Sequence, residues 1–390
     1  MVNNELNILI VLAVIIFASP YVSKIFRMPI APVEIILGAL AGYFGLIGHS
    51  DTFKLVSEIG FFYLMFLAGT EVDLKIFFTM DKKILRTGLL YVALLYLLSV
   101  VVTFGLNLDK LFILIIPIMS VGMIFTLFKE YGKDKDWLNL GMLIGSVGEV
   151  VSIALLTFAG AYLRFGAGSE LLLSIAYLVG FLALSIVGFK ILNVLFWWYP
   201  QLRTMLMPYS DNAEKDIRLC MALFFSIIAL MLYLNLEIAF GAFVAGTFIA
   251  TFFDHKKDLP HKLASFGFGF LVPTFFVYIG STFKLTALLL DGVVTDALLI
   301  TAAIISARIL CGTVFINLLG LRKTLLYALS HSMPLTLLIA VATIAYKSGG
   351  INENFYFSFI LASLTQAIIV TICIKILMSY ENKNLQKELK

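Results

Sequence analysis

Charged residues are scarce in this sequence. Asp, Glu, Lys and Arg make up 13% of the 390 residues, whereas a soluble domain averages about 25%. A soluble chain of this length needs a charged surface over its core, and this composition does not provide one. Since 61% of the residues are hydrophobic, lipid is the natural solvent for the chain.

Cysteine is nearly absent as well. Cys220, Cys311 and Cys373 each lie inside an apolar run, far from one another in sequence. We interpret them as small buried hydrophobic residues and expect neither a disulfide nor a zinc site.

Several functional signals are missing. We find no phosphate-binding Walker loop, no arrangement typical of nucleophilic catalysis and no His-rich metal motif. The net charge of +4 comes without basic clusters interleaved with aromatic residues, so nucleic acid is not an expected partner. We therefore predict neither an enzyme nor a cofactor-dependent protein, and no metal other than a transported monovalent cation.

Long apolar runs fill most of the chain instead. A spanning helix needs about 20 mostly apolar residues, and the sequence predicts an all-α polytopic membrane protein of about 13 such helices. No Lys or Arg precedes the first run, so we interpret it as a permanent span rather than a signal peptide. The predicted spans are 6–26, 29–48, 55–76, 84–106, 109–129, 137–162, 171–199, 216–235, 238–253, 264–283, 296–319, 324–347 and 353–379.

The loops between these spans differ in charge. With the N-terminus outside, the cytoplasmic loops carry roughly twenty Lys and Arg residues and the external loops about five, the asymmetry expected of membrane proteins. We predict a multi-pass protein of the cell (inner) membrane with its C-terminus in the cytoplasm.

Two pairs of motifs repeat along the chain. Residues 37–43 and 66–75 resemble residues 240–247 and 277–286, so that spans two and three match spans nine and ten. The offset is seven spans, an odd number, so the two copies would run in opposite directions through the bilayer. Inverted repeats are typical of secondary transporters, although a chance likeness of Gly- and Ala-rich stretches is the alternative.

Two ionisable residues lie in the middle of predicted spans. Glu149 is in span six and Arg308 in span eleven, each near the bilayer midplane. Such groups are costly in hydrocarbon and tend to be functional. We expect them to meet as a charge-assisted pair at an ion site, the alternative being a permanent salt bridge that orients two helices. Ser146 belongs to the small face beside Glu149, which leaves room for an ion or permits close helix packing.

Spans five and twelve contain residues that interrupt helices, and they too are seven spans apart. Interruption in the membrane would free carbonyl oxygens and helix ends for an ion, the alternative for span twelve being an ordinary proline kink. His331 could also relay or sense protons, or simply hydrogen-bond a neighbour. The residues of this predicted crossing are Pro117, Ser120, Gly122, His331, Ser332 and Pro334.

The chain resembles the cation:proton antiporter-2 family, the Kef/Nap-type sodium/proton exchanger domain, over almost its whole length. The resemblance rests on the order and spacing of four stretches, 32–42, 66–74, 240–250 and 271–285. It implies an exchanger domain over 1–380 in a homodimer, with crossing broken helices in spans five and twelve and a cytoplasmic tail over 381–390. It also implies a dimerisation part (1–76 and 216–283), a moving core (84–162 and 296–379) and a linker helix (171–199).

The resemblance further implies roles for single residues. The family's ion site uses an Asp preceded by Asp, Asn or Gln, and here Gly148-Glu149 stands in its place. Arg308 matches a basic residue that is often Lys, and Met119-Ser120 replaces Thr-Ser. The resemblance still implies an ion site built on a carboxylate, but these departures leave open which ion it binds.

From these observations we predict exchange of Na⁺ or K⁺ for protons by alternating access. Glu149, with Ser120 and Ser146, would bind either the cation or the proton, and Arg308 would supply a supporting charge. A single exchanging carboxylate favours an electroneutral cycle. The alternatives are a channel-like K⁺ efflux system of the same fold and a non-transporting membrane sensor or scaffold.

Overall fold

The structure is a computed structural model. It describes residues 2–388 except for 27, 49, 72–80, 133, 166–167, 207–213, 235, 237, 254–255, 257 and 291. Residues 72–76 of the third predicted span and residues 389–390 of the predicted tail therefore lie outside the described residues.

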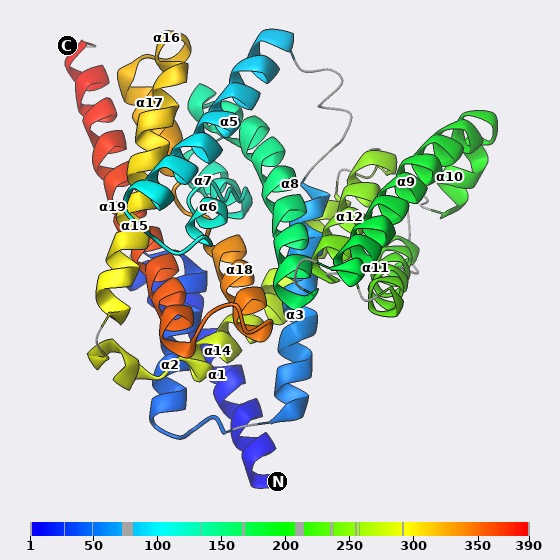
Figure 1. Ribbon diagram of the computed structural model, residues 1–390, viewed down its shortest axis with the longest axis horizontal. Coiled ribbons are helices and arrows are strands. Elements are labelled where there is room, and N and C mark those ends of the chain that lie inside the picture. The colour runs from blue at the N-terminus through cyan, green and yellow to red at the C-terminus, as the bar shows by residue number, and fades with distance from the viewer. Residues whose placement is uncertain are drawn as a thin grey trace. The chain divides into compact units, whose positions relative to one another are not determined.

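Within the described residues every regular element is helical (Figure 1). Three short segments have other helical geometries: η1 (Gly267–Leu271), η2 (Leu285–Leu289) and η3 (Thr313–Phe315). The α-helices are α1 (Val2–Phe26), α2 (Ile30–Tyr43), α3 (Asp51–Thr70), α5 (Lys82–Gly105), α6 (Phe112–Ile115), α7 (Gly122–Tyr131), α8 (Asp136–Phe165), α9 (Ser169–Trp198), α10 (Pro200–Leu206), α11 (Lys215–Tyr233), α12 (Ile238–Phe252), α13 (Leu259–Phe266), α14 (Val272–Thr282), α15 (Val293–Gly312), α16 (Ile316–Leu319), α17 (Leu321–Ser330), α18 (Leu335–Lys347) and α19 (Glu353–Glu388).

The helices match the predicted spans. Among the described residues, 10 helical stretches are long and apolar enough to cross a membrane, and α2 and α12 are shorter apolar helices. Helices α6 and α7 together occupy the remaining predicted span. The prediction of an all-helical polytopic membrane protein with about 13 spans is confirmed.

The chain folds into two compact units. The first unit comprises residues 1–19, 34–79 and 157–282, and the second comprises 20–33, 80–156 and 283–390. Assignment of the dimerisation part, the moving core and the linker to these segments stays a prediction.

Glycines bring helices of the first unit into backbone contact. A Cβ added to Gly69 of α3 would lie 2.0 Å from the carbonyl oxygen of Phe243, and one added to Gly246 of α12 would lie 2.0 Å from that of Phe66. Helices α2 and α14 meet in the same way, at Gly38 and Gly280. These glycines belong to the repeated motifs, so the motifs are packing surfaces. The inverted relation between the two copies stays a prediction.

Replacing Gly246 by Ala should destabilise the first unit, because the new methyl group would overlap the α3 backbone. Overpacking of this kind costs about 1–3 kcal/mol. We expect a lower melting temperature in detergent, measured by fluorescence-detected size-exclusion chromatography. Gly180→Ala in α9 is the matched control, because its Cβ would meet no heavy atom within 4 Å apart from its chain neighbours and the backbone of its own helix. Equal melting temperatures for the two variants would show that the close approach is unimportant.

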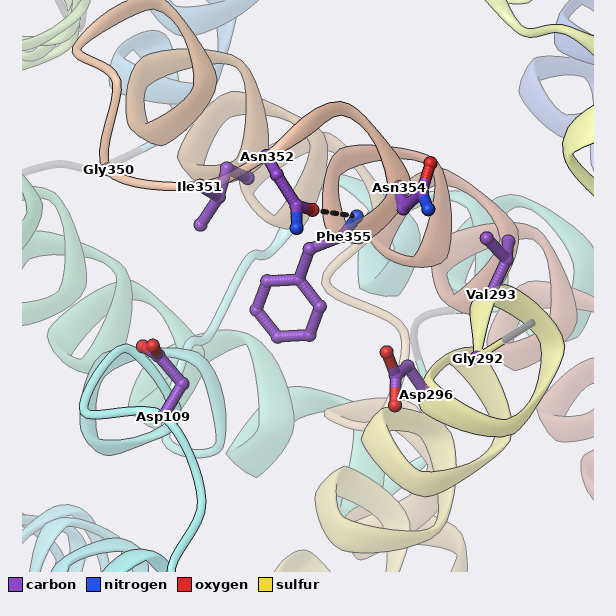
Figure 2. A pocket seen from close by; sticks show the side chains of 9 residues that line it. All are labelled: Asp109, Gly292, Val293, Asp296, Gly350, Ile351, Asn352, Asn354 and Phe355. Atoms are coloured by element: carbon purple, nitrogen blue, oxygen red, sulfur yellow. Dashed lines mark hydrogen bonds between the residues drawn. The ribbon is translucent and has the colours of Figure 1, made fainter. Parts of the chain in front are cut away.

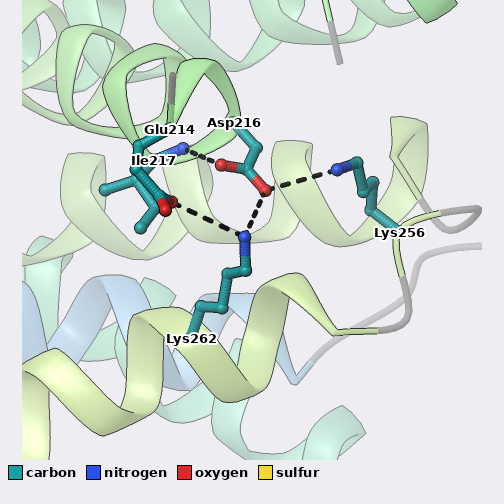
Figure 3. Close-up of polar contacts among 5 residues, drawn as sticks. All are labelled: Glu214, Asp216, Ile217, Lys256 and Lys262. Atoms are coloured by element: carbon teal, nitrogen blue, oxygen red, sulfur yellow. Dashed lines mark hydrogen bonds and ion pairs between the residues drawn. The ribbon is translucent and has the colours of Figure 1, made fainter. Parts of the chain in front are cut away.

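An ion cluster lies at the start of α11 in the first unit (Figure 3). Asp216 is fully buried and accepts hydrogen bonds from the Ile217 amide at 2.8 Å, from Lys262 at 3.2 Å and from Lys256 at 3.4 Å. Glu214 lies 3.6 Å from Lys262. Because its charge is balanced on several sides, Asp216 joins α11 to the segment around α13 and is a structural carboxylate.

The second unit contains two interrupted helices. The first break, 116–121, separates α6 from α7, and the second, 331–334, separates α17 from α18. Pro117 lacks an amide hydrogen and cannot donate a hydrogen bond within a helix, and Pro334, which also lacks one, is the N-cap residue of α18. The predicted interruption of both spans is confirmed. Helix α18 is almost wholly buried and packs against α19, which also packs against α15.

Candidate ion-binding site

Glu149 lies in the interior of the second unit. It is on α8 and its exposed fraction is 0%. Its Oε1 accepts a hydrogen bond from the Ser120 hydroxyl at 3.3 Å, and its Oε2 accepts one from the Val121 amide at 3.3 Å. Both donors belong to the break before α7, so the interrupted helix presents a hydroxyl and a free amide directly to the carboxylate.

The first break meets the start of α18 through two hydroxyls. Ser120 Oγ and Thr336 Oγ1 are 3.0 Å apart, and either can be the donor. Gly122 lies against both, since a Cβ there would be 3.8 Å from the Ser120 hydroxyl and 3.9 Å from that of Thr336. Glu149, Ser120 and Thr336 therefore form one buried oxygen cluster. We call it the Glu149 cluster.

Arg308 contacts the same two breaks from α15. Its exposed fraction is 0%. Nη1 donates to the carbonyl oxygen of Ile116 at 2.6 Å and to that of Ile304 at 3.2 Å. Nη2 donates to the carbonyl oxygen of Ile118, and Nε donates to the backbone carbonyl oxygen of His331 at 2.6 Å. Interrupted helices leave carbonyl oxygens without intrahelical partners. The planar guanidinium, with five donors in a fixed fork, satisfies several of them at once.

The hydrogen-bond partners of Glu149 and Arg308 differ from the direct pair that we expected between them. Among the described residues, the hydrogen bonds of the guanidinium go to four carbonyl oxygens, and those of the carboxylate come from Ser120 and Val121. The physical reason is that the broken backbones supply three of these acceptors, at Ile116, Ile118 and His331, and buried acceptors must be satisfied in a dry interior. Arg308 is a positioning residue that joins the two breaks.

His331 also connects a break to α8. Nδ1 lies 3.0 Å from the carbonyl oxygen of Tyr327, and Nε2 lies 3.1 Å from that of Gly141. A Cβ on Gly145 would come within 3.3 Å of the imidazole. Gly141 and Gly145 lie on the helix face that continues to Glu149. His331 thus anchors the second break on the helix that carries Glu149, and its proton-relay role stays a prediction.

The remaining predicted residues have local partners. The hydroxyl of Ser146 donates to the Met142 carbonyl at 2.8 Å, and that of Ser332 donates to Ala328 at 2.8 Å. Each hydroxyl donates to the carbonyl four residues earlier in the chain, as Ser often does. Pro334 is the N-cap of α18. The structure therefore places Ser120 in the hydrogen-bond network of Glu149, while the described hydrogen bonds of Ser146 and Ser332 lie outside it.

Two members of the network are missing from the predicted site. Val121 contributes only its amide, which no side-chain pattern reveals. Thr336 follows Pro334 by two residues, much as Ser120 follows Pro117 by three. This common arrangement of a hydroxyl just beyond a helix-breaking proline is the signal that would have identified Thr336.

Replacing Thr336 by Val should weaken cation binding, because it removes the hydroxyl that contacts Ser120 and keeps the shape of the side chain. A hydrogen bond contributes about 0.5–1.5 kcal/mol, so we expect the half-maximal cation concentration for exchange to rise roughly two- to tenfold. Thr343→Val is the control on the same helix, since the hydroxyl of Thr343 donates to its own helix at Ile339. Equal effects of the two substitutions would show that the Thr336 hydroxyl is not part of the cation-binding site.

A separate pocket of about 420 Å³ lies elsewhere in the second unit (Figure 2). Asp109 and Asp296 lie on opposite sides of the Phe355 ring, and the Asn352 side chain accepts a hydrogen bond from the Phe355 amide at 2.8 Å. The lining residues precede α6, begin α15, and precede and begin α19. None of them belongs to the predicted ion site.

These features define a multi-pass helical membrane protein with a buried carboxylate at two helix breaks. The sequence profile of the family described as "Sodium/hydrogen exchanger, transmembrane" matches residues 10–380. The chain belongs to this family.

Known proteins resemble the chain along most of its length. The putative Na(+)/H(+) antiporter YjbQ of Bacillus subtilis is 25% identical over 100% of this chain, which spans 66%, just under two thirds, of that relative. The probable Na(+)/H(+) antiporter 3 of Methanocaldococcus jannaschii is 23% identical over 93% of both chains. The ammonium/H(+) antiporter subunit AmhT of Alkalihalophilus pseudofirmus is 26% identical over 91% of this chain and 90% of its own length.

A solved structure shares the fold. The sodium proton antiporter MjNhaP1 from Methanocaldococcus jannaschii superposes with a TM-score of 0.69, covering 94% of this chain and 97% of that chain at 16% sequence identity. At that identity the likeness establishes the arrangement of the helices.

Proposed function

We propose that this protein exchanges a monovalent cation for protons across the membrane, with Glu149 carrying both in turn. The observation that supports this most directly is the surroundings of the carboxylate. Glu149 is fully buried, and the hydrogen-bond donors that the described residues offer it are a neutral hydroxyl and a neutral amide. A buried carboxylate without a compensating charge is very costly, so it needs either a proton or a cation.

Competition for one carboxylate is sufficient for antiport. The proton and the cation cannot both neutralise a single negative charge, so each crossing of the membrane carries one or the other. If Glu149 alone exchanges, one cation moves for one proton and the cycle is electroneutral. Arg308 keeps its charge throughout, because its donors are engaged by backbone carbonyls.

Alternating access requires that the part of the protein carrying the ion site move relative to a part that stays fixed in the membrane. We assign the moving part to the second unit, which holds the Glu149 cluster, and the dimerisation part to the first unit, where glycines pack the helices tightly. The proposed assembly is a homodimer in the cell membrane, with the N-terminus outside and the C-terminus in the cytoplasm.

We propose Na⁺ or K⁺ as the cation for this chain. Two of the relatives named above are described as Na(+)/H(+) antiporters, which supports Na⁺, and the third is described as an ammonium/H(+) antiporter subunit.

Purified protein in liposomes containing a pH-sensitive dye tests the proposal. With an acidic lumen, external Na⁺ or K⁺ should drive proton efflux and restore fluorescence. Cation flux without proton movement would identify a channel-like efflux system, and the absence of any flux would favour a sensor or scaffold. Either outcome contradicts exchange.

A further inference from the structure

Two buried tyrosines lie beside the second break. Tyr91 is on α5 and Tyr327 is on α17, one turn before His331, and both have exposed fractions of 0%. Their ring centroids are 5.5 Å apart, and they lie 6.1 Å and 4.5 Å, respectively, from the imidazole ring of His331. The ring of Phe315 lies 5.6 Å from that of Tyr91 and 4.7 Å from that of Tyr327. We call these four rings the aromatic cluster.

The hydroxyl groups of the two tyrosines are unusual. Each hydroxyl oxygen is buried, and the described residues offer it no hydrogen-bond partner. A buried Tyr hydroxyl normally has a partner, because removing it from water without one is costly. Tyr63 in the first unit follows this rule, since it is equally buried and donates to the Leu263 carbonyl at 3.1 Å. Phe315 occupies the aromatic cluster without a hydroxyl, so ring packing there does not require one.

The guanidinium of Arg308 is near both tyrosines, and its positive charge acts on each phenol group. A guanidinium has five N–H donors. The described hydrogen bonds of Arg308 use four of them, one on Nε, two on Nη1 and one on Nη2. The second N–H of Nη2 therefore has no acceptor among the described residues. Three polar groups in this part of the second unit share that condition.

A small ligand that both donates and accepts hydrogen bonds would satisfy these groups. Buried water typically makes about three hydrogen bonds to groups that would otherwise be unsatisfied, and two hydroxyls and one N–H supply that number. A hydronium ion is disfavoured, because the charge of Arg308 repels a second positive charge in an interior of low dielectric constant. The ligand that fits is therefore a neutral water molecule rather than a carrier of protons.

We infer that the hydroxyls of Tyr91 and Tyr327 bind an internal water molecule beside Arg308. The water joins α5 to α17 by hydrogen bonds, close to the point where α17 ends at the second break. The described contacts of Tyr91 within the aromatic cluster are ring contacts, so the water gives this residue its polar link to α17. The inference is independent of the proposed function, because its tests do not use transport.

Phenylalanine variants test the water through the sign of the stability change. Tyr91→Phe and Tyr327→Phe each keep the ring and remove one partner of the water. Each should therefore lower the melting temperature in detergent by a few degrees. The double variant should lose less than the sum of the two single losses, because both hydroxyls act through the same water. Tyr63→Phe combined with Tyr91→Phe is the control and should show additive losses, since Tyr63 has a partner of its own.

Two results of the melting experiment would overturn the inference. One is an unchanged or higher melting temperature in either single variant, because removing an unused buried hydroxyl is neutral or stabilising. The other is additive losses in the Tyr91→Phe, Tyr327→Phe double variant, which would mean that the two hydroxyls have separate partners.

A high-resolution cryo-EM map of the unaltered protein distinguishes water from other partners. We expect a density peak within about 3.2 Å of both hydroxyl oxygens. A direct hydrogen bond between the two hydroxyls, with no such peak, would overturn the inference. A bound anion is tested by replacing gluconate with chloride in the buffer. We expect the same melting temperature in both, whereas a rise in chloride that the double variant lacks would identify an anion site instead.

Discussion

Replacing Glu149 by Gln is expected to reduce cation-driven proton efflux to the level of liposomes without protein. The amide has nearly the same size and still accepts a hydrogen bond, so the fold should persist. It neither releases a proton at any relevant pH nor neutralises a cation, and the exchange therefore has no carrier. The measurement is dye dequenching on addition of each alkali cation in turn, with the protein content of the liposomes matched.

A second buried carboxyl provides the control for this substitution. Glu34, in the first unit, is 4% exposed and accepts a hydrogen bond from the Ser19 hydroxyl at 3.2 Å. Glu34→Gln removes a buried carboxyl of the same kind outside the Glu149 cluster and should leave coupled efflux largely intact. Full activity of Glu149→Gln, or equal losses in both variants, would show that Glu149 is not the exchanging group.

Replacing Arg308 by Gln should cost both stability and transport. The substitution removes the donors that satisfy carbonyls in both breaks, and unsatisfied buried polar groups are expensive. Removing one partner of a buried charged network typically costs about 3–5 kcal/mol. We expect a clear fall in melting temperature and loss of exchange, because Ser120 and Thr336 would lose the backbone that positions them.

Two further variants separate charge from geometry at Arg308. Arg308→Lys keeps a positive charge but lacks the planar fork, so we expect partial recovery of stability. Arg322, which donates to the Leu377 carbonyl and is half-buried, is the control: Arg322→Gln should have a much smaller effect on melting temperature. If Arg308→Gln melts and transports like the unaltered protein, the carbonyl contacts are not what holds the breaks together.

Much of the fold could be predicted because its signals are local in the sequence. The length and apolarity of each run define the spans, and Pro117 and Pro334 mark the two breaks because proline acts through its own backbone. Glu149 and Ser120 could also be predicted as site residues, because an acidic residue in the middle of a span and a hydroxyl next to a helix break are each recognisable in the sequence.

The contacts across the second unit could not be predicted in the same way. Ser120 and Thr336 are separated by 216 positions, and their contact depends on how two broken helices cross. The partners of Arg308 were misjudged because opposite charges suggest a pair, whereas unsatisfied carbonyls leave no trace in a sequence. A Cβ on Gly148 would overlap the side chain of Met119, and no sequence pattern shows that these two residues lie side by side.

Competition between a proton and a cation at Glu149 is the central claim, and its most direct test is the pH dependence of the half-maximal cation concentration. Competition at one group makes this concentration rise as the pH falls, approaching tenfold per pH unit when the proton-bound form predominates. The maximal rate at saturating cation should stay the same at each pH. A half-maximal concentration that stays constant while acid lowers only the maximal rate would mean that both ions bind at once, and would contradict exchange through a single carboxylate.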